Sequence, residues 1–396
     1  MTITQEQKYN VRRKKLLDDF MCLGDKCPDT CCKSWSMQFN ESHLELYKSK
    51  APELLSAVNQ EEMIMKRDPE TDYCTKFVNG LCSIHKKYGA DYLGDACYLY
   101  PKSTRTMGRD ITVTATLSCP EITRLALYDH SDPFGDHETE VSRIPESVKD
   151  YLPHDMKPEN TKIIMDHFIK FAGNNDISTI EILRGIISAS RSLAYQDKAK
   201  WPEATEFLLK TSQNRVLPAE KHITDPYKLM HSLCGLVGVA KKQNLPNLRR
   251  IIDHMLKKLQ LNFNWENLTI HNQNENLTAY NEIKDIWDTQ ARDAIEPVLK
   301  RYIQAQLSIT HFPFDGFGES LFERACVIGI RYATIRLCLM LHLQADGSLP
   351  NKNDIIHLIY NISRFQDHIN DSQLSLSIYN DFGWIKEQRM AGLLES

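Results

Sequence analysis

Eight of the eleven cysteines lie in the first third of the chain, and they are the residues best suited to chemistry. Thiolates clustered in this way bind zinc or iron–sulfur clusters, carry out redox work, or pair as disulfides. The clustered set is Cys22, Cys27, Cys31, Cys32, Cys74, Cys82, Cys97 and Cys119. The other three, Cys234, Cys326 and Cys338, lie on apolar stretches with helical spacing and are expected in a hydrophobic core.

The first residues are polar and basic, without the apolar region of a secretion signal, so we expect a cytoplasmic protein. Thiols stay reduced there, which favours metal binding or redox work over disulfides. Zinc sites usually contain C-x-x-C pairs, and this cysteine set has none. The spacing therefore favours an iron–sulfur cluster, with zinc and free or redox thiols as alternatives.

Adjacent cysteines are expected to point their side chains apart. One of Cys31 and Cys32 would then bind the metal, while the other packs or serves a second site. Cys119 precedes a proline, as does a cysteine ligand in bacterial ferredoxins.

Local signals predict the elements that position these thiols. Gly24 and Pro28 indicate a loop around the first four cysteines. Asn40 is a typical N-cap for a helix that begins at residue 41. Asn79-Gly80 predicts a tight hairpin turn that brings Cys74 and Cys82 near each other.

The rest of the chain reads as successive helices. Apolar residues at helical spacing predict them at 160–172, 177–195, 202–212, 226–242, 246–260, 278–307, 318–344, 352–367 and 371–393. The fold class is therefore α+β. We expect a small cysteine-rich metal-binding or iron–sulfur domain over residues 1–130, a linker or surface loop over 131–158, and an all-α domain over 159–396.

The formal net charge of −4 argues against a basic nucleic-acid binder. The longest apolar stretch, residues 326–343, is interrupted by Arg331 and Arg336, so a buried helix is expected in place of a transmembrane segment. Peripheral membrane association stays compatible with this pattern. The two arginines are expected in internal ion pairs, and the alternative is that they bind a ligand carboxylate.

The cysteine spacing resembles the flagellin lysine-N-methylase family, part of a wider CxxCxxCC group of zinc- and iron-chelating proteins. The similar positions are Cys22, Cys27, Cys31, Cys32, Trp35, Cys74, Cys82, Ile84, His85, Gly89, Cys97, Tyr100 and Pro101. Tyr302–Phe314 and Ser363-Arg364-Phe365 with His368 resemble later family segments. Lys102 stands where the family pattern has arginine, and the first cysteines are spaced more loosely than in the group name.

The resemblance implies an enzyme that methylates surface lysines of flagellin. S-adenosylmethionine would be the methyl donor, and cysteines would hold a 4Fe–4S cluster. The sequence contains no glycine-rich nucleotide-binding turn, so we expect the donor in a cleft between the two domains. The alternative function is a non-catalytic zinc- or iron-binding or redox-sensing module with a helical partner-binding domain.

Three polar features near the expected metal centre have simpler interpretations. His85 is expected to cap or pack a short helix in preference to binding the metal. Trp35 fits an ordinary core residue as well as a cover over the cluster. Arg364, Asp367 and His368 are expected on a solvated helix face, and the alternative is a polar cluster at the site.

Overall fold

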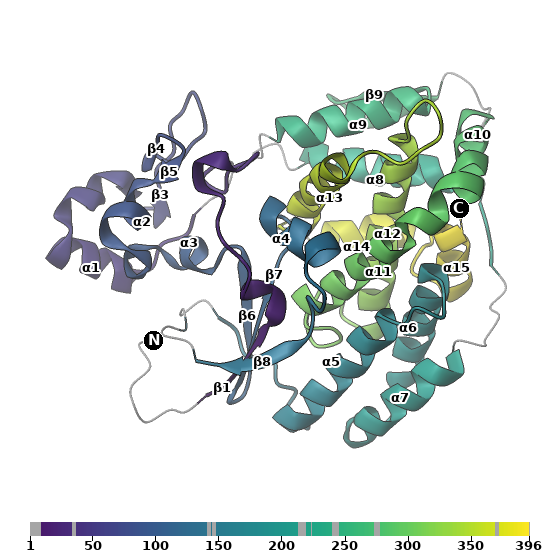
Figure 1. Ribbon diagram of the computed structural model, residues 1–396, viewed down its shortest axis with the longest axis horizontal. Helices are drawn as coiled ribbons and strands as arrows, with labels where there is room; N and C mark the ends of the chain where they lie inside the picture. Colours follow the sequence, from purple (N-terminus) through teal and green to yellow (C-terminus); the bar gives the residue numbers. More distant parts are fainter. Residues whose placement is uncertain are drawn as a thin grey trace.

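The computed structural model describes residues 9–33, 37–140, 144, 148–212, 219–222, 224–239, 245–272, 278–368 and 372–395. Trp35 lies outside these ranges. A small lobe of short helices and hairpins lies beside a four-stranded sheet and a large helical body (Figure 1). This arrangement confirms the predicted α+β class.

Residues 37–99 form the small lobe, here called the cysteine-rich lobe. Its elements are α1 (Glu41–Lys50), a 3-10 turn (Pro52–Ala57), β2 (Val58–Asn59), β3 (Ile64–Met65), β4 (Phe77–Val78), β5 (Leu81–Cys82), α2 (Ser83–Tyr88) and α3 (Asp95–Leu99). The lobe buries its own small core, which includes Phe39, Tyr47 and Leu54. Asn40 caps α1 as predicted, because its side-chain oxygen accepts the His43 amide at 3.0 Å.

The predicted hairpin turn is also confirmed. Asn79 and Gly80 both adopt positive φ, 51° and 78°, as a type I′ turn requires. The turn joins β4 to β5 in an antiparallel ladder, in which Phe77 pairs with Cys82.

A second sheet contains β1 (Asn10–Lys14), β6 (Lys102–Met107), β7 (Asp110–Ala115) and β8 (Asp136–Thr139) in the order β6-β7-β1-β8. β1 runs parallel to β7 and antiparallel to β8. The apolar residues of this sheet, such as Val11 and Ile111, belong to the core of the helical body. β8 lies within residues 131–158, which the sequence suggested as a linker or surface loop. The proposed domain boundaries stay a prediction.

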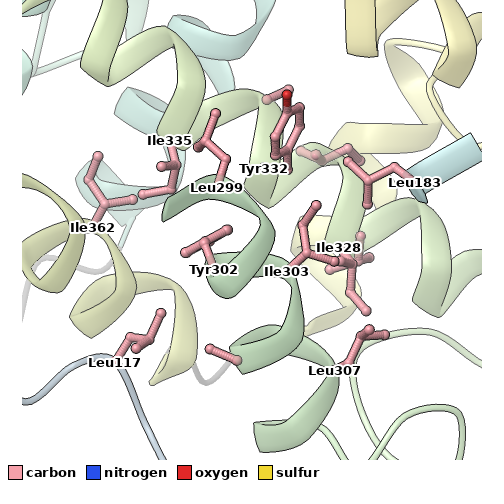
Figure 2. Packing of buried hydrophobic residues seen from close by; sticks show 14 of the residues in the cluster. Leu117, Leu183, Leu299, Tyr302, Ile303, Leu307, Ile328, Tyr332, Ile335 and Ile362 are labelled. Atoms are coloured by element: carbon pink, nitrogen blue, oxygen red, sulfur yellow. The ribbon is translucent and has the colours of Figure 1, made fainter. Parts of the chain in front are cut away.

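The helical body is built around α12 (Leu321–Leu341), in which every residue from Ala325 to Leu341 is buried. Figure 2 shows side chains of α12 packing against α11 (Arg292–Ile309), with Ile328 and Tyr332 beside Leu299 and Ile303. The surrounding helices are α4 (Pro120–Arg124), α5 (Pro158–Ala172), α6 (Thr179–Leu193), α7 (Trp201–Ser212), α8 (Asp225–Val239), α9 (Pro246–Lys258), α10 (Thr278–Ile286), α13 (Lys352–Asp367), α14 (Ser372–Asp381) and α15 (Glu387–Glu395).

Three features differ from the helices expected over these residues. The long helix expected over 278–307 is α10, a π-helical turn at Trp287–Ala291, and α11. The helix expected over 371–393 is two helices, because the chain turns at Gly383, where φ is +76°. The hairpin of β9 (Leu261–Asn264) and β10 (Thr269–Asn272) was not anticipated. Among the described residues, no helix combines the length and apolarity that a membrane crossing requires.

Candidate metal centre

The first cysteine loop, residues 21–33, carries four of the eight clustered thiols. A 3-10 turn at Gly24–Lys26 separates Cys22 from Cys27, and the Cys27 amide donates to the Gly24 carbonyl at 3.2 Å. Cys31 and Cys32 follow at the end of the loop. The positive φ of Gly24, 58°, is one that glycine adopts without strain, which suits it to this turn.

The other four thiols come to this loop from separate elements. Cys74 and Cys82 flank the β4–β5 hairpin, Cys97 lies in α3, and Cys119 is the N-cap residue of α4. The Cys74 amide donates to the Cys32 carbonyl at 2.7 Å. A Cβ placed on Gly80 would lie 2.9 Å from the Asp25 Cβ, so the hairpin tip also touches the loop.

None of the eight thiols is paired in a disulfide. Cys22 and Cys31 are exposed, Cys74 and Cys119 are buried, and the others are partly buried. Within the described residues, no three cysteine, histidine or carboxylate side chains are already positioned around a single metal ion.

The thiols form two sets, defined by which of them raise one another's pKa values through their charges. In the first set, burial raises the pKa of Cys97, and the charges of Cys74 and Cys82 raise it further. The Cys32 thiol also lies within range of Cys82 and Cys74. Cys32, Cys74, Cys82 and Cys97 therefore lie within electrostatic range of one another in the lobe.

The second set lies between the first loop and α4. Burial raises the pKa of Cys27, and the charges of Cys22 and Cys31 add to the rise. Burial raises the pKa of Cys119 to about 12, and the charges of Cys27 and Cys31 again contribute. Cys31 is in range of both sets, since its charge also raises the pKa values of Cys74 and Cys97.

Cys31 and Cys32 form a hydrogen-bonded pair at the junction of the two sets, so the expectation that their side chains point apart is wrong. The hydrogen bond from the Cys32 thiol lowers the pKa of Cys31 to about 7, and the positive charge of Arg364 contributes to this lowering. The same hydrogen bond raises the pKa of Cys32. Cys31 is therefore the more acidic thiol and the readier of the two to act as a ligand or nucleophile at neutral pH.

Helix α13 of the helical body holds the first cysteine loop. Arg364 forms an ion pair with Asp29, and its Nη2 donates to the Thr30 carbonyl at 2.5 Å. Figure 1 shows this loop passing close to α4 and α13. Arg364 and the side chain of Asp367 are buried, so the expected solvated helix face is wrong. This end of α13 contacts the first cysteine loop through Arg364.

Asp367 and His368 extend the same polar contact. Asp367 accepts hydrogen bonds from Thr116 at 2.6 Å and from Arg331 at 3.3 Å. Ser118 precedes Cys119 in the chain, and its hydroxyl lies 3.0 Å from His368 Nε2. Burial lowers the pKa of His368 to about 3, so this imidazole is neutral at physiological pH.

The structure also shows the burial and contacts of the other candidate residues. His85 is exposed on α2, and Cys234, Cys326 and Cys338 are buried in the helical core as predicted. Arg331 makes the expected internal ion pair, with Asp367. The same expectation is wrong for Arg336, which forms no ion pair among the described residues and donates instead to the Leu394 carbonyl at 2.6 Å. The contact from Asp29 to Arg364 was missed, because nothing local in the sequence links residues so far apart.

Comparison with known proteins identifies the family. Residues 162–380 match the FliB lysine N-methylase C-terminal domain. This match covers more than half of the chain. The chain belongs to the FliB lysine N-methylase family. The family resemblance predicted from the sequence is therefore confirmed, although the cysteine region lies outside the matched segment.

Three Salmonella proteins show similarity over 135 residues, or 31% of this chain. The flagellar biosynthetic protein FliU of Salmonella muenchen is 22% identical, with 80% of its length matched. The lysine-N-methylases of Salmonella choleraesuis and Salmonella typhimurium are 22% and 24% identical. The chain matches only 34% of the length of either methylase. No solved structure matches the chain.

Proposed function

We propose that this protein is a protein-lysine N-methyltransferase of the cytoplasm that modifies surface lysines of flagellin. Its methyl donor would be S-adenosylmethionine, and its clustered cysteines would hold a 4Fe–4S centre. The observation that carries the proposal is membership of the FliB lysine N-methylase family across residues 162–380. The similarity to a flagellar biosynthetic protein supports a flagellar substrate.

The donor chemistry of the lobe fits an iron–sulfur centre. Eight unpaired thiols surround the junction of lobe and helical body, and soft thiolates are the ligands that such clusters take. Cys31, Cys32, Cys74, Cys82 and Cys97 lie within range of one another's charges and would be the main ligands, with Cys22, Cys27 and Cys119 as further candidates. When bound, the cluster would supply either a structural centre or an open iron that holds the donor.

Methyl transfer requires a neutral lysine amine aligned with the methyl group. The nitrogen lone pair attacks the methyl carbon while the carbon–sulfur bond breaks, so the sulfonium becomes a thioether. The proton left on nitrogen passes to solvent. A desolvated position would lower the pKa of the substrate lysine and supply the neutral amine.

An exposed apolar patch adjoins the thiols and suits a protein substrate. Met21 and Leu23 of the first cysteine loop are 78% and 36% exposed, and Val78 and Leu81 of the β4–β5 hairpin are 51% and 36% exposed. Such clustered apolar exposure commonly marks interaction sites. We propose that flagellin binds across this patch, next to Cys22 and Cys82.

The acidic Cys31 next to Cys32 also supports a second candidate function, a redox-sensing module. A vicinal thiol pair with one lowered pKa is suited to thiol–disulfide exchange. This alternative requires no iron and no methyl donor.

The test is anaerobic purification, metal analysis, and mass spectrometry of flagellin lysines after incubation with S-adenosylmethionine. We expect a brown protein containing iron and sulfide, and methylated flagellin. Cys31→Ser should lose iron, whereas the core variant Cys338→Ser should keep it. A colourless, zinc-containing or metal-free protein that leaves flagellin lysines unmodified would support the alternative.

A further inference from the structure

The turn between β7 and α4, residues 116–119, carries Cys119 and has polar contacts with the end of α13. Thr116 Oγ1 donates to Asp367 Oδ2 at 2.6 Å, and Ser118 Oγ lies 3.0 Å from His368 Nε2. Each contact joins residues about 250 positions apart in the chain. The turn that presents Cys119 is therefore held directly by the helical body.

Hydrogen bonds inside this turn restrict its conformation further. The Ser118 amide donates to Thr116 Oγ1 at 3.1 Å, and the hydroxyl of Thr123, in α4, donates to the Leu117 carbonyl at 2.6 Å. Thr116, Ser118 and Thr123 are at most 4% exposed. Because a buried hydroxyl is costly without a partner, a network in which each hydroxyl has one specifies a single geometry. A shift of the turn would break several of these bonds together.

The same end of α13 also holds the first cysteine loop. Arg364 pairs with Asp29 and donates to the Thr30 carbonyl, directly before Cys31 in the chain. Arg364 and His368 are four positions apart, so they lie on one side of the helix end. A single rigid element therefore contacts both the segment that carries Cys31 and the turn that carries Cys119.

Ser118 connects the turn to the cysteine-rich lobe as well. Its hydroxyl oxygen lies 3.4 Å from the Tyr100 hydroxyl, and Tyr100 directly follows α3, the helix that carries Cys97. The rings of Tyr100 and His368 have centroids 6.3 Å apart. Three segments that carry thiols, from the lobe, the first loop and the start of α4, therefore contact side chains at or next to the end of α13.

We infer that Asp367 and His368 are positioning residues for the thiol centre. Through the turn they fix Cys119 within reach of Cys31, where it can join the same metal. The inference rests on the proposed function only in taking the thiols as a metal centre. A ligand fixed before the metal arrives loses less conformational entropy on binding, and outer-shell hydrogen bonds strengthen metal sites in this way. The alternative is a contact that stabilises the fold and has no effect on metal binding.

Titration of the metal-free full chain with cobalt(II) tests the inference, because thiolate-to-cobalt absorption reports how many thiolates bind the metal. Cys119→Ser should remove part of this absorption. Thr116→Val, which keeps the shape of threonine but removes its hydroxyl, and His368→Phe should each weaken cobalt binding about tenfold or more. Thr116→Ser restores the hydroxyl and should bind cobalt as the parent does.

A matched variant separates positioning from stability. Thr205→Val removes a fully buried hydroxyl in α7, which donates to the Trp201 carbonyl at 2.6 Å, and it should leave cobalt binding unchanged. Urea titration of each variant measures its free energy of unfolding, so cobalt affinities are compared for folded protein. A contact that only stabilises the fold would lower the free energy of unfolding in Thr116→Val and Thr205→Val alike and leave both cobalt affinities at the parent value.

Unchanged cobalt absorption in Cys119→Ser would overturn the inference, as would parent-like cobalt affinity in either Thr116→Val or His368→Phe. Undetectable cobalt binding by the parent protein would overturn it too. These readouts involve neither flagellin nor S-adenosylmethionine. Unmodified flagellin together with the expected cobalt results would therefore refute the proposed function and leave the positioning residues standing.

Discussion

Replacing Arg364 with glutamine should release the first cysteine loop from helix α13. The side chains of Arg364 and Asp29 are 7% and 19% exposed. Glutamine would remove the charge that pairs with Asp29 and the donor to the Thr30 carbonyl. The loop would then lose its main polar attachment to the helical body.

The expected effect follows from the burial of the pair. Breaking a buried ion pair by removing one partner costs about 3–5 kcal/mol, because the other charge is left without compensation. Asp29 keeps some contact with solvent, so we expect about 3 kcal/mol, the lower end of that range. This energy shifts the ratio of attached to detached loop by roughly a hundredfold.

Hydrogen–deuterium exchange in the metal-free protein measures this ratio directly. Amides with hydrogen bonds in the loop, such as that of Cys27, should exchange much faster in Arg364→Gln than in the parent. The Arg364→Lys variant keeps the charge but not the two-pronged geometry, so it should fall between them. The surface variant Lys210→Gln, which breaks an exposed pair with Glu206, should match the parent.

Unchanged exchange in Arg364→Gln would refute the argument, since it would mean that the loop is held by its other contacts. Iron content provides a second readout under the proposed function. Iron should fall in Arg364→Gln if the attachment places Cys31 for binding.

Three further predictions concern stability and substrate binding. Burial lowers the pKa of His311 to about 3, below its unfolded value of about 6.5. Its stabilising contribution is therefore present above pH 6.5 and lost on acidification. The free energy of unfolding measured in urea should be about 2–3 kcal/mol lower at about pH 4.5 than at pH 7, and His311→Gln should reduce this pH dependence. Asp225 accepts hydrogen bonds from Arg389 at 2.7 Å and from Trp384 at 3.3 Å, so Asp225→Asn should lower the free energy of unfolding by about 3–5 kcal/mol. A loss of less than about 1 kcal/mol in the free energy of unfolding, measured by urea titration, would contradict the importance of the Asp225–Arg389 ion pair. Under the proposed function, Val78→Asp should raise the KM for flagellin several-fold without changing iron content, and an unchanged KM would remove the hairpin from the binding surface.

The sequence by itself determined features whose causes are local. The side chain of Asn40 caps the helix that begins at the next residue, and Asn79-Gly80 tolerates the positive φ of a two-residue turn. Most helices of the body were predictable because apolar spacing reflects burial on one face. The clustering of eight cysteines also predicts a thiol-based centre, which stays a prediction.

Tertiary structure decided the features that join distant segments. The pairing of β1 with β7 and β8, and the attachment of Asp29 to Arg364, connect residues from about a hundred to more than three hundred positions apart. The grouping of the thiols around Cys31 arises in the same way. No local signal encodes such contacts, because their energy depends on which surfaces the whole chain buries together. The sequence could therefore name the reactive residues, while only the fold decided which of them face one another.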